Sequence, residues 1–430
     1  MQDKYLTKYI RENFDIETTI FDSIRYELDH HIYSYGQQFI NAREKGKSSF
    51  TKNILRNKAI EIIGKIIIIL GCFTLSKKAT GRKAILSNAY FSINNELSKL
   101  GFDVYRPIWA NPSRDTKILI DLKTYYQCEY IKKALREEKF IDIIDNEFIE
   151  KICLLKSCLN DYYVRYQISA LFIPNDVSFF ENLSIQIFKE IERPSFIFLH
   201  GLPGRYNSID ENRSDYLIVW GEKIKEHYIQ TGISEKKIFV SGHPYYKELK
   251  NKELKFGLEA PLVLTKSMLG APHSDGVYLS DRGNSILYLY SIQSVLSNFG
   301  VKQVRLRAHP SENSQWYLKF IDNDFFKIDS DSLQDSLHKS TVVIGPASTV
   351  FLESIYHGVN YICYEPSINN IDLMNSTLAP PFDGSDSRLP VAKNENELAL
   401  IIKDREIVNI NIFNDYVKTP FDLSFVSTLI

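Results

Sequence analysis

The sequence predicts an α/β protein in which two doubly wound parallel sheets face a cleft, with extra helices on the N-terminal side. Three observations lead to this fold class. The chain has 430 residues, which is too long for one ordinary hydrophobic core. Short apolar segments alternate with helix-like segments, as in parallel sheets. This alternation occurs twice, in halves of similar size, and an aperiodic charged stretch at 247–260 separates them.

The composition is that of a globular protein without unusual charge. Apolar residues make up 44% of the chain and charged residues 24%. The formal net charge is −1, so no overall field attracts nucleic acid, and no nucleic-acid partner is predicted. Five scattered cysteines without metal-like spacing indicate a reducing compartment and argue against a disulfide framework. Since the polar N-terminus shows no signal peptide, a cytoplasmic location is predicted.

Residues 1–80 are predicted to form a mostly helical N-terminal segment, because Tyr, Ile and Phe recur at mixed spacings of three and four. Within it, the apolar run 60–75 is shorter than the roughly 20 residues that span a bilayer, and Glu61 and Lys65 interrupt it. One interpretation is a core helix or strand. The other is an interfacial segment with basic flanks, which would attach the protein peripherally to the inner face of the cell membrane.

The first half, residues 81–255, is predicted to be a Rossmann-like domain. It begins with a strand at 84–86, a helix at 93–100 that ends at Gly101, and a short strand at 104–105. The long, charged stretch at 116–165 that follows is helix-like. Beyond it, strands are expected at 169–173, 195–199, 215–221 and 238–240, and helices at 185–191 and 222–230.

The second half, residues 256–430, is predicted to be a second Rossmann-like domain. The expected strands are 262–264, 304–308, 325–328, 341–344 and 361–364, and the expected helices are 285–299, 333–338 and 348–357. Ligands of doubly wound sheets bind outside the carboxyl ends of the strands. Polar residues at those ends are therefore the candidate site residues.

Two motifs in the second half indicate a phosphate site. The strand at 304–308 ends in His309-Pro310, and the strand at 341–344 breaks at Gly345-Pro346 before Ser348-Thr349 opens a helix. A helix N-terminus offers backbone N–H groups and partial positive charge to a phosphate. His309 would donate a hydrogen bond to that phosphate, while both hydroxyls and the N–H groups after Pro346 hold its oxygens. The alternative is that these residues only end a strand and cap a helix.

Neighbouring carboxylates extend this candidate site. Glu353 lies four residues after Thr349 on one helix face, where it could hold a site hydroxyl or a ribose, or could simply be exposed. Asp329 and Asp331 follow the strand at 325–328 and could bind ribose hydroxyls or only cap a helix. The predicted catalytic residues are His309, Asp176 and His200; the predicted binding residues are Pro310, Asp329, Asp331, Gly345, Ser348, Thr349 and Glu353.

Arg305 and Arg307 lie on the same strand as the His-Pro corner. They would either add positive charge near the site or form structural ion pairs. The only closely spaced aspartate pairs that resemble a metal clamp are at 322–324 and 329–331, and no metal is predicted.

If the protein is a transferase, the first half would have to supply the general base that takes the proton of the acceptor. Asp176 follows the strand at 169–173, and His200 follows the strand at 195–199, so both are candidates. Asn88, after the first strand, could position an acceptor. The alternatives are that Asp176 only forms a turn and that His200 only marks a corner. His243 ends the last strand at the hinge and is the weaker catalytic candidate.

The order of these motifs resembles the bacterial GT-B glycosyltransferases that use CMP-activated nonulosonic acids, the sialyltransferase-like enzymes. His309-Pro310 and Ser348-Thr349, which lie 39 positions apart, match their HP and S-S/T motifs. The resemblance implies a GT-B-like fold in which residues 81–255 form the acceptor-side domain and residues 256–430 the nucleotide-sugar-binding domain. It also implies assistance by His309 in the departure of CMP, and phosphate binding by Ser348 and Thr349. It also implies an acidic residue on the ribose near Asp329 or Asp331. It covers residues 300–366 clearly and 169–245 diffusely, and the family's acidic base motif has no match here.

The resemblance implies an inverting transfer of a sialic-acid-like sugar from a CMP-sugar donor to an oligosaccharide or lipid-linked glycan, as in capsule polysaccharide biosynthesis. It implies no cofactor and no metal. The same motifs are similar to those of Kdo transferases and of CDP-glycerol glycerophosphotransferases of teichoic acid synthesis. A non-catalytic protein that binds sugar nucleotides or glycans is the alternative from another class. A UDP-sugar 2-epimerase would share the two-domain fold and is a third option.

Overall fold

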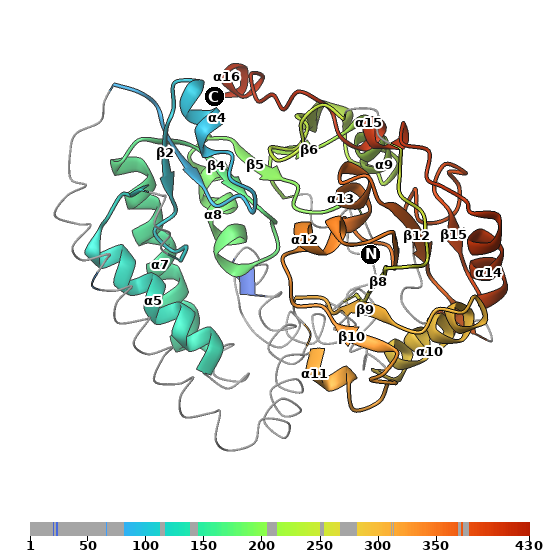
Figure 1. Cartoon of the computed structure of the whole chain (residues 1–430). Coiled ribbons are helices and arrows are strands. Elements are labelled where there is room, and N and C mark those ends of the chain that lie inside the picture. Colours follow the sequence, from blue (N-terminus) through green and yellow to red (C-terminus); the bar gives the residue numbers. More distant parts are fainter. Residues whose placement is uncertain are drawn as a thin grey trace.

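The computed structural model places two sheet-containing halves side by side (Figure 1). It describes residues 81–111, 117–137, 145–203, 213–249, 253–266, 282–310, 312, 314–368, 371–372 and 378–430, together with Ile20, Ser23, Ile24 and Ile66. The predicted N-terminal helical segment and the apolar run at 60–75 lie outside the described residues, apart from those four. Within the described part of the chain, no helix is long and apolar enough to cross a bilayer.

The first half contains a seven-stranded parallel sheet with the strand order β3-β2-β1-β4-β5-β6-β7. Its strands are β1 (Ala84–Ser87), β2 (Asp103–Arg106), β3 (Lys117–Ile118), β4 (Ile168–Ile173), β5 (Ser195–Phe198), β6 (Tyr216–Val219) and β7 (Ile238–Val240). The chain starts in the interior of the sheet, moves to one edge, and returns past its first strand to build the other edge. This order is that of a doubly wound, Rossmann-like domain.

The helices of the first half lie on both sides of this sheet. They are α4 (Asn94–Lys99), α5 (Leu122–Glu137), α7 (Asn146–Arg165), α8 (Phe179–Glu190) and α9 (Glu222–Gln230), with a 3₁₀ turn η2 (Glu235–Lys237). Helix α7 begins where the Asp145 carboxylate accepts the N–H of Glu147, and it buries Ile152, Leu155 and Leu159 at helical spacing.

The second half contains a six-stranded sheet with the order β10-β9-β8-β11-β12-β15, which repeats the first six strands of the first half. Its strands are β8 (Pro261–Leu264), β9 (Val304–Arg307), β10 (Phe326–Ile328), β11 (Val342–Gly345), β12 (Asn360–Tyr364) and β15 (Val391–Ala392), and a separate antiparallel pair is formed by β13 (Ser367–Ile368) and β14 (Ile371–Asp372). The predicted fold class, an α/β, GT-B-like pair of Rossmann-like domains, is confirmed.

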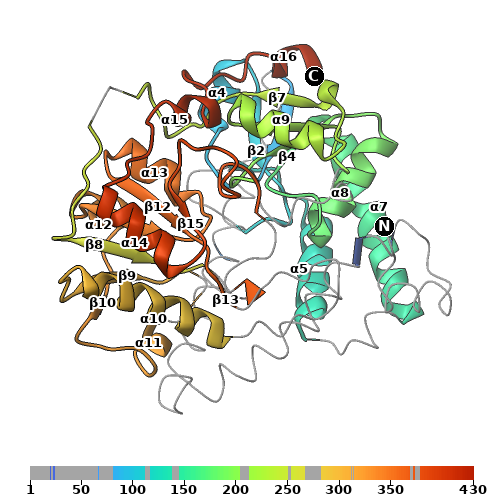
Figure 2. The ribbon, with the colours of Figure 1, turned by 90° about the vertical axis from the view of Figure 1, so that its right-hand side faces the viewer.

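The helices that follow residue 256 are α10 (Arg282–Asn298), α11 (Ser314–Tyr317), α12 (Leu333–His338), α13 (Val350–Tyr356), α14 (Glu395–Asp404), α15 (Ile412–Tyr416) and α16 (Val426–Leu429). Four of them, α10, α12, α13 and α14, cover the two faces of the second sheet. Figure 2 views the molecule from the side that carries α10 and α14. Apolar residues of these two helices pack with one face of the sheet, while α12 and α13 pack with the other.

One hydrophobic cluster joins the two halves. Along β4, Ala170 and Phe172 point into it, whereas Leu171 and Ile173 point into a separate cluster under α5, α7 and α8. We call the shared one the central cluster; its members include Ile85, Phe172, Phe196, Trp220, Leu264, Val343, Phe351, Tyr361, Phe413, Tyr416 and Val426. The two sheets therefore share one buried core in addition to their own outer ones.

The last described segment, 417–430, returns from the second half to the first. The Lys418 N–H donates to the carbonyl oxygen of Trp220 at 2.7 Å, and the Asp422 N–H donates to that of Ser241 at 2.8 Å. Lys83 Nζ reaches the Ile430 carbonyl oxygen at 2.7 Å. Helix α16 accordingly lies beside the first half in both views (Figures 1 and 2).

Several predicted elements differ in extent from the observed ones. The helix-like stretch 116–165 contains a strand, β3, and two helices, α5 and α7. The helix predicted at 185–191 begins at Phe179, because buried Phe179, Phe180 and Leu183 already belong to its apolar face. Strand β15 was not predicted, since two residues are too few to show an alternating pattern.

Candidate functional site

The second sheet brings both predicted phosphate motifs to one edge. Its strand order reverses between β8 and β11, and such a switch point is where ligands of doubly wound sheets bind. The register pairs Leu264 with Arg307 and Val263 with Ile344. The residues that follow β8, β9 and β11 are therefore neighbours, and Thr265-Lys266 lies between His309 and the turn that begins at Gly345.

The His-Pro corner is held by a carboxylate. The His309 N–H donates to Thr265 Oγ1 at 3.0 Å and to Glu312 Oε2 at 3.2 Å, and the Glu312 N–H returns to the His309 carbonyl oxygen at 2.8 Å. Thr265 Oγ1 donates to Glu312 Oε2 at 2.5 Å, and the Tyr317 hydroxyl donates to Oε1 at 2.8 Å. The imidazole of His309 remains at the surface, beside Pro310.

Sequence reasoning missed Glu312, although a carboxylate three residues after a strand-ending histidine is a common turn arrangement. It also missed Lys266, which directly follows the first strand of the second sheet. The pKa of His309 lies below its usual value, because surrounding protein partly desolvates the imidazole and because Lys266 adds a repulsive charge. At neutral pH this histidine is therefore an uncharged donor next to a cationic amine.

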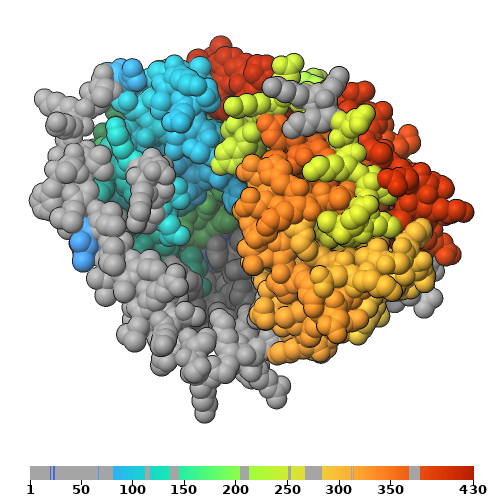
Figure 3. Space-filling view, in the orientation of Figure 1, coloured from blue at the N-terminus to red at the C-terminus, as the bar shows by residue number. Residues whose placement is uncertain are grey.

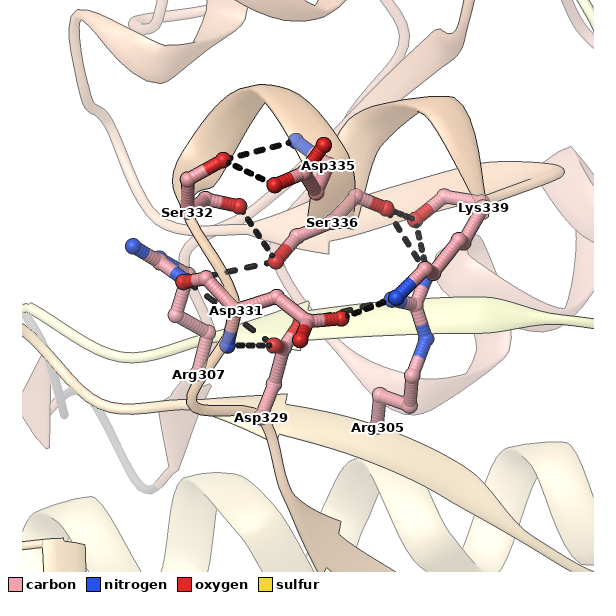
Figure 4. Close-up of polar contacts among 9 residues, drawn as sticks. Arg305, Arg307, Asp329, Asp331, Ser332, Asp335, Ser336 and Lys339 are labelled. Carbon is pink, nitrogen blue, oxygen red and sulfur yellow. Dashed lines mark hydrogen bonds and ion pairs between the residues drawn. The ribbon is translucent and has the colours of Figure 1, made fainter.

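Arg305 and Arg307 form internal ion pairs, which is one of the two roles considered for them. Arg305 Nη1 lies 3.4 Å from Asp329 Oδ2, and Arg307 Nη1 lies 3.9 Å from Asp329 Oδ1 (Figure 4). The Asp329 side chain is only 1% exposed. The carboxylate predicted to contact a ribose is thus engaged inside the protein, between two guanidinium groups.

Asp331 lies at the outer side of the same cluster (Figure 4). Its carbonyl oxygen accepts from Arg307 Nη1 at 2.7 Å, and its carboxylate pairs with Lys339 Nζ at 2.5 Å. The pKa of the Asp331 carboxyl is lowered by this hydrogen bond to Lys339 and by the charge of that lysine. Of the two predicted ribose ligands, Asp331 is the exposed one.

The turn between β11 and α13 is tightly built. A Cβ on Gly345 would lie 2.6 Å from the Tyr361 hydroxyl, so glycine is required at this position. The Ala347 N–H, one of the groups predicted to hold a phosphate, donates to Glu365 Oε1 at 2.6 Å. The Ser348 hydroxyl accepts the N–H of Val350 at 3.3 Å and lies half-buried at the start of α13.

Thr349 connects the two halves directly. Its Oγ1 accepts the N–H of Leu202 at 3.2 Å, and it lies against Gly201. Leu202 follows His200 after β5, so the mouth of α13 contacts the strand end that carries a candidate base. On the face drawn in Figure 3, the surface is hollowed where the first half meets the orange residues of the second half.

His200 is exposed and oriented by one hydrogen bond. Its Nδ1 lies 3.0 Å from the carbonyl oxygen of Pro174, which follows β4. A carbonyl oxygen only accepts, so Nδ1 carries a proton, and in the neutral ring Nε2 is then the nitrogen with the free lone pair. This tautomer is the one required of a general base that uses Nε2.

Asp176, the other candidate base, is 2% exposed. Its carboxylate accepts the N–H of Arg213 at 2.6 Å and so holds the chain just before β6. Burial raises the pKa of Asp176 to about 6, and the hydrogen bond to Arg213 opposes that rise. The structure therefore separates the two candidates: His200 faces solvent, and Asp176 holds a buried loop junction.

Glu353 lies half-buried on α13, between the halves. Burial raises its pKa to about 7, and the charge of Arg307 opposes the shift. Burial raises the pKa of Tyr246 in the connecting segment, and the charge of Glu353 adds to that rise. Over the described ranges, no three His, Cys, Asp or Glu side chains form a group that could hold a metal ion.

No protein-family model matches this chain, and no curated protein matches it. Solved structures are similar to it in overall arrangement. A putative UDP-N-acetylglucosamine 2-epimerase from Listeria monocytogenes has a TM-score of 0.44 at 11% identity, covering 81% of this chain and 94% of its own. The UDP-GlcNAc 2-epimerase from Neisseria meningitidis, bound to UDP-GlcNAc, has a TM-score of 0.43 at 12% identity, covering 78% and 92%.

A lipopolysaccharide outer core galactosyltransferase, WaaB, is similar to the same extent. Its TM-score is 0.43 at 11% identity, and the match covers 80% of this chain and 96% of that one. The strand orders of its two sheets place the chain in the two-domain, GT-B-like α/β class.

Proposed function

We propose that this chain is an inverting glycosyltransferase that transfers a sialic-acid-like nonulosonic acid from a CMP-activated donor to a hydroxyl of a surface glycan. The observation that supports this most is the contact between Thr349 and Leu202. It joins the predicted phosphate motif of one half to the strand end that bears His200 in the other. Donor and acceptor groups would then meet at this junction.

The donor phosphate would lie at the switch point of the second sheet. Lys266 would supply positive charge, and the neutral imidazole of His309 would donate a hydrogen bond to the departing CMP. Ser348, at the start of α13, would bind a further phosphate oxygen. Glu312 would act as a positioning residue, because it fixes the backbone of His309 without facing the ligand.

The acceptor proton would pass to His200. Its Nε2 is left as the basic nitrogen by the contact of Nδ1 with Pro174. The acceptor oxygen would attack the anomeric carbon of the donor as the bond from that carbon to the CMP phosphate oxygen breaks. Asp176 is the less suitable base, because its carboxylate is buried and holds the Arg213 N–H.

A nucleotide thermal-shift experiment tests the donor site without an acceptor. Wild-type protein, Lys266→Ala and His338→Ala would be heated with CMP, CDP, UDP or no nucleotide. His338 is an exposed histidine of the same half and serves as the control position. We expect CMP to raise the Tm of wild type and of His338→Ala more than UDP does, and Lys266→Ala to lose most of that rise. A preference for UDP would contradict the CMP assignment and favour a UDP-sugar enzyme such as a 2-epimerase.

A donor panel then separates the remaining alternatives. CMP-N-acetylneuraminic acid, CMP-Kdo and CDP-glycerol would be incubated with glycan acceptors, and nucleotide release would be followed. Release from CMP-N-acetylneuraminic acid supports the proposal, whereas release only from CMP-Kdo or CDP-glycerol assigns one of the related transferases. Binding of CMP without release from any donor indicates a non-catalytic binding protein.

A further inference from the structure

A row of aromatic rings lies beside His200 at the carboxyl edge of the first sheet. The ring of Tyr90 is 6.2 Å from that of His200, between centroids, and 5.0 Å from that of Phe91. Phe91 in turn lies 5.5 Å from Tyr245. Tyr90 follows β1 and Tyr245 follows β7, so residues far apart in the sequence meet here.

The two tyrosines at the ends of this row are strongly exposed. Tyr90 is 72% exposed and Tyr245 is 62% exposed, the highest values among the large hydrophobic residues that the structure describes. Burial of an aromatic ring normally contributes substantially to stability, and neither ring gains that contribution in the protein alone. Both exposed rings therefore lie next to the candidate base, where a ligand could cover them.

Buried residues support the row of rings from below. Phe91 packs edge-on against buried His243 at 4.3 Å and against Trp220 at 5.7 Å. His243 Nδ1 accepts the N–H of Tyr245 at 3.2 Å, and Trp220 Nε1 donates to the Leu199 carbonyl oxygen at 3.0 Å. The exposed tyrosines thus project from a packed foundation, and a ligand would meet a largely preformed surface.

We propose that Tyr90 and Tyr245, supported by Phe91, form an aromatic platform that holds sugar rings of the acceptor beside His200. One face of a pyranose ring presents C–H groups with partial positive charge, and the face of an aromatic ring carries partial negative charge. Stacking on the platform would leave the sugar hydroxyls at the rim, where one can reach Nε2 of His200. The platform deepens the proposed function and rests on it for the identity of the ligand as an acceptor.

Glycan binding tests the platform directly. Wild-type protein, Tyr90→Ala, Tyr245→Ala and the conservative variants Tyr90→Phe and Tyr245→Phe would be applied to an array of bacterial and mammalian glycans, with and without CMP. Affinity for the best-bound glycan would then be measured in solution. We expect each alanine variant to bind about tenfold more weakly, and the phenylalanine variants to bind like wild type, because stacking needs the ring and not the hydroxyl.

Tyr126→Ala is the matched control, since Tyr126 is 61% exposed on α5 of the same half. It should bind glycans like wild type. The platform is overturned if wild type binds no glycan under either condition, if both alanine variants bind normally, or if Tyr126→Ala weakens binding equally. CMP binding is measured separately: glycan binding through the platform without any CMP response would refute the transferase and leave the platform standing.

Discussion

At the scale of single residues, Glu312 and Lys266 determine what the His-Pro corner can do. Glu312 binds the backbone N–H of His309 and the hydroxyls of Thr265 and Tyr317, so the imidazole does not have to hold the turn. Partial burial lowers the pKa of that imidazole, and the charge of Lys266 lowers it further. The result is a neutral hydrogen-bond donor on a fixed backbone, which is the arrangement needed to stabilise a leaving phosphate.

Replacement of His309 tests this role. His309→Ala should lower kcat by about 10²–10³-fold, the usual effect of removing one preorganised donor to a developing anion. The measurement is nucleotide release from the donor selected by the panel. His338→Ala is the control and should leave kcat unchanged. A His309→Ala enzyme with near-normal turnover would remove His309 from the mechanism.

Glu353 should make stability depend on pH. Its pKa is about 7 in the folded protein, above the usual value of 4.5, so the folded state binds more protons between those two values. The stability contributed by the protonated carboxyl is complete below pH 4.5 and is lost as the pH rises through 7. Glu353→Gln cannot ionise and should therefore unfold with a flatter pH dependence.

Denaturant unfolding at several pH values measures this effect. Relative to wild type, Glu353→Gln should gain about 1–2 kcal/mol between pH 5 and pH 8. Glu395→Gln, at the start of the outer helix α14, is the control for replacing a carboxylate by an amide. Parallel pH profiles for wild type and Glu353→Gln would show that the Glu353 carboxyl titrates normally.

At the scale of elements, the two charged residues of β9 tie this strand to β10 and α12. Arg305 and Arg307 share the face opposite to Val304 and Leu306, and their guanidinium groups enclose Asp329 (Figure 4). Alternation along a single strand therefore gives one apolar face to the outer core and one charged face to the site side. This arrangement orients the strand that ends in His309.

Removing the enclosed carboxylate should be costly. Asp329→Ala leaves two partly buried guanidinium groups without their shared partner and should lower the free energy of unfolding by about 3 kcal/mol. The exposed neighbour Asp331 provides the comparison, since Asp331→Ala should change stability little. Equal effects of the two substitutions in denaturant unfolding would contradict the structural role of Asp329.

The sequence predicted the order of strands and helices well, because buried strands and Gly-terminated helices leave local patterns. It located His309, Ser348 and Thr349 at strand ends for the same reason. It could not predict that Thr349 contacts Leu202, or that Asp176 is buried against the Arg213 N–H, because such contacts join distant segments. The internal pairing of Asp329 was equally invisible, since a solvated and an enclosed carboxylate look alike in a sequence.

At the scale of the whole molecule, the returning segment 417–430 completes the first half. Gly242 has φ +84, and a Cβ there would overlap the carbonyl oxygen of Lys418. The backbone of this segment therefore lies closer to the end of β7 than it could if residue 242 carried a side chain. The same segment adds Val417, Leu423 and Val426 to the central cluster.

Gly242→Ala tests this close approach. The substitution should lower the free energy of unfolding by about 2–4 kcal/mol, from the strained φ together with displacement of the segment. Gly101→Ala is matched to it, because Gly101 has φ +91 but open space around its Cα. That control should show only the backbone strain, about 1 kcal/mol. If both variants lose the same stability, the contact with Lys418 contributes nothing.

The return of this segment also sets an order of events during synthesis. The ribosome releases the first half early, while the residues that cover the carbonyl groups of Trp220 and Ser241 are still to be made. The inner face of the first sheet therefore stays uncovered until the second half has left the ribosome and residues 417–430 can pack against it. A nascent chain of this protein therefore exposes apolar surface of the first half until residues 417–430 have been translated.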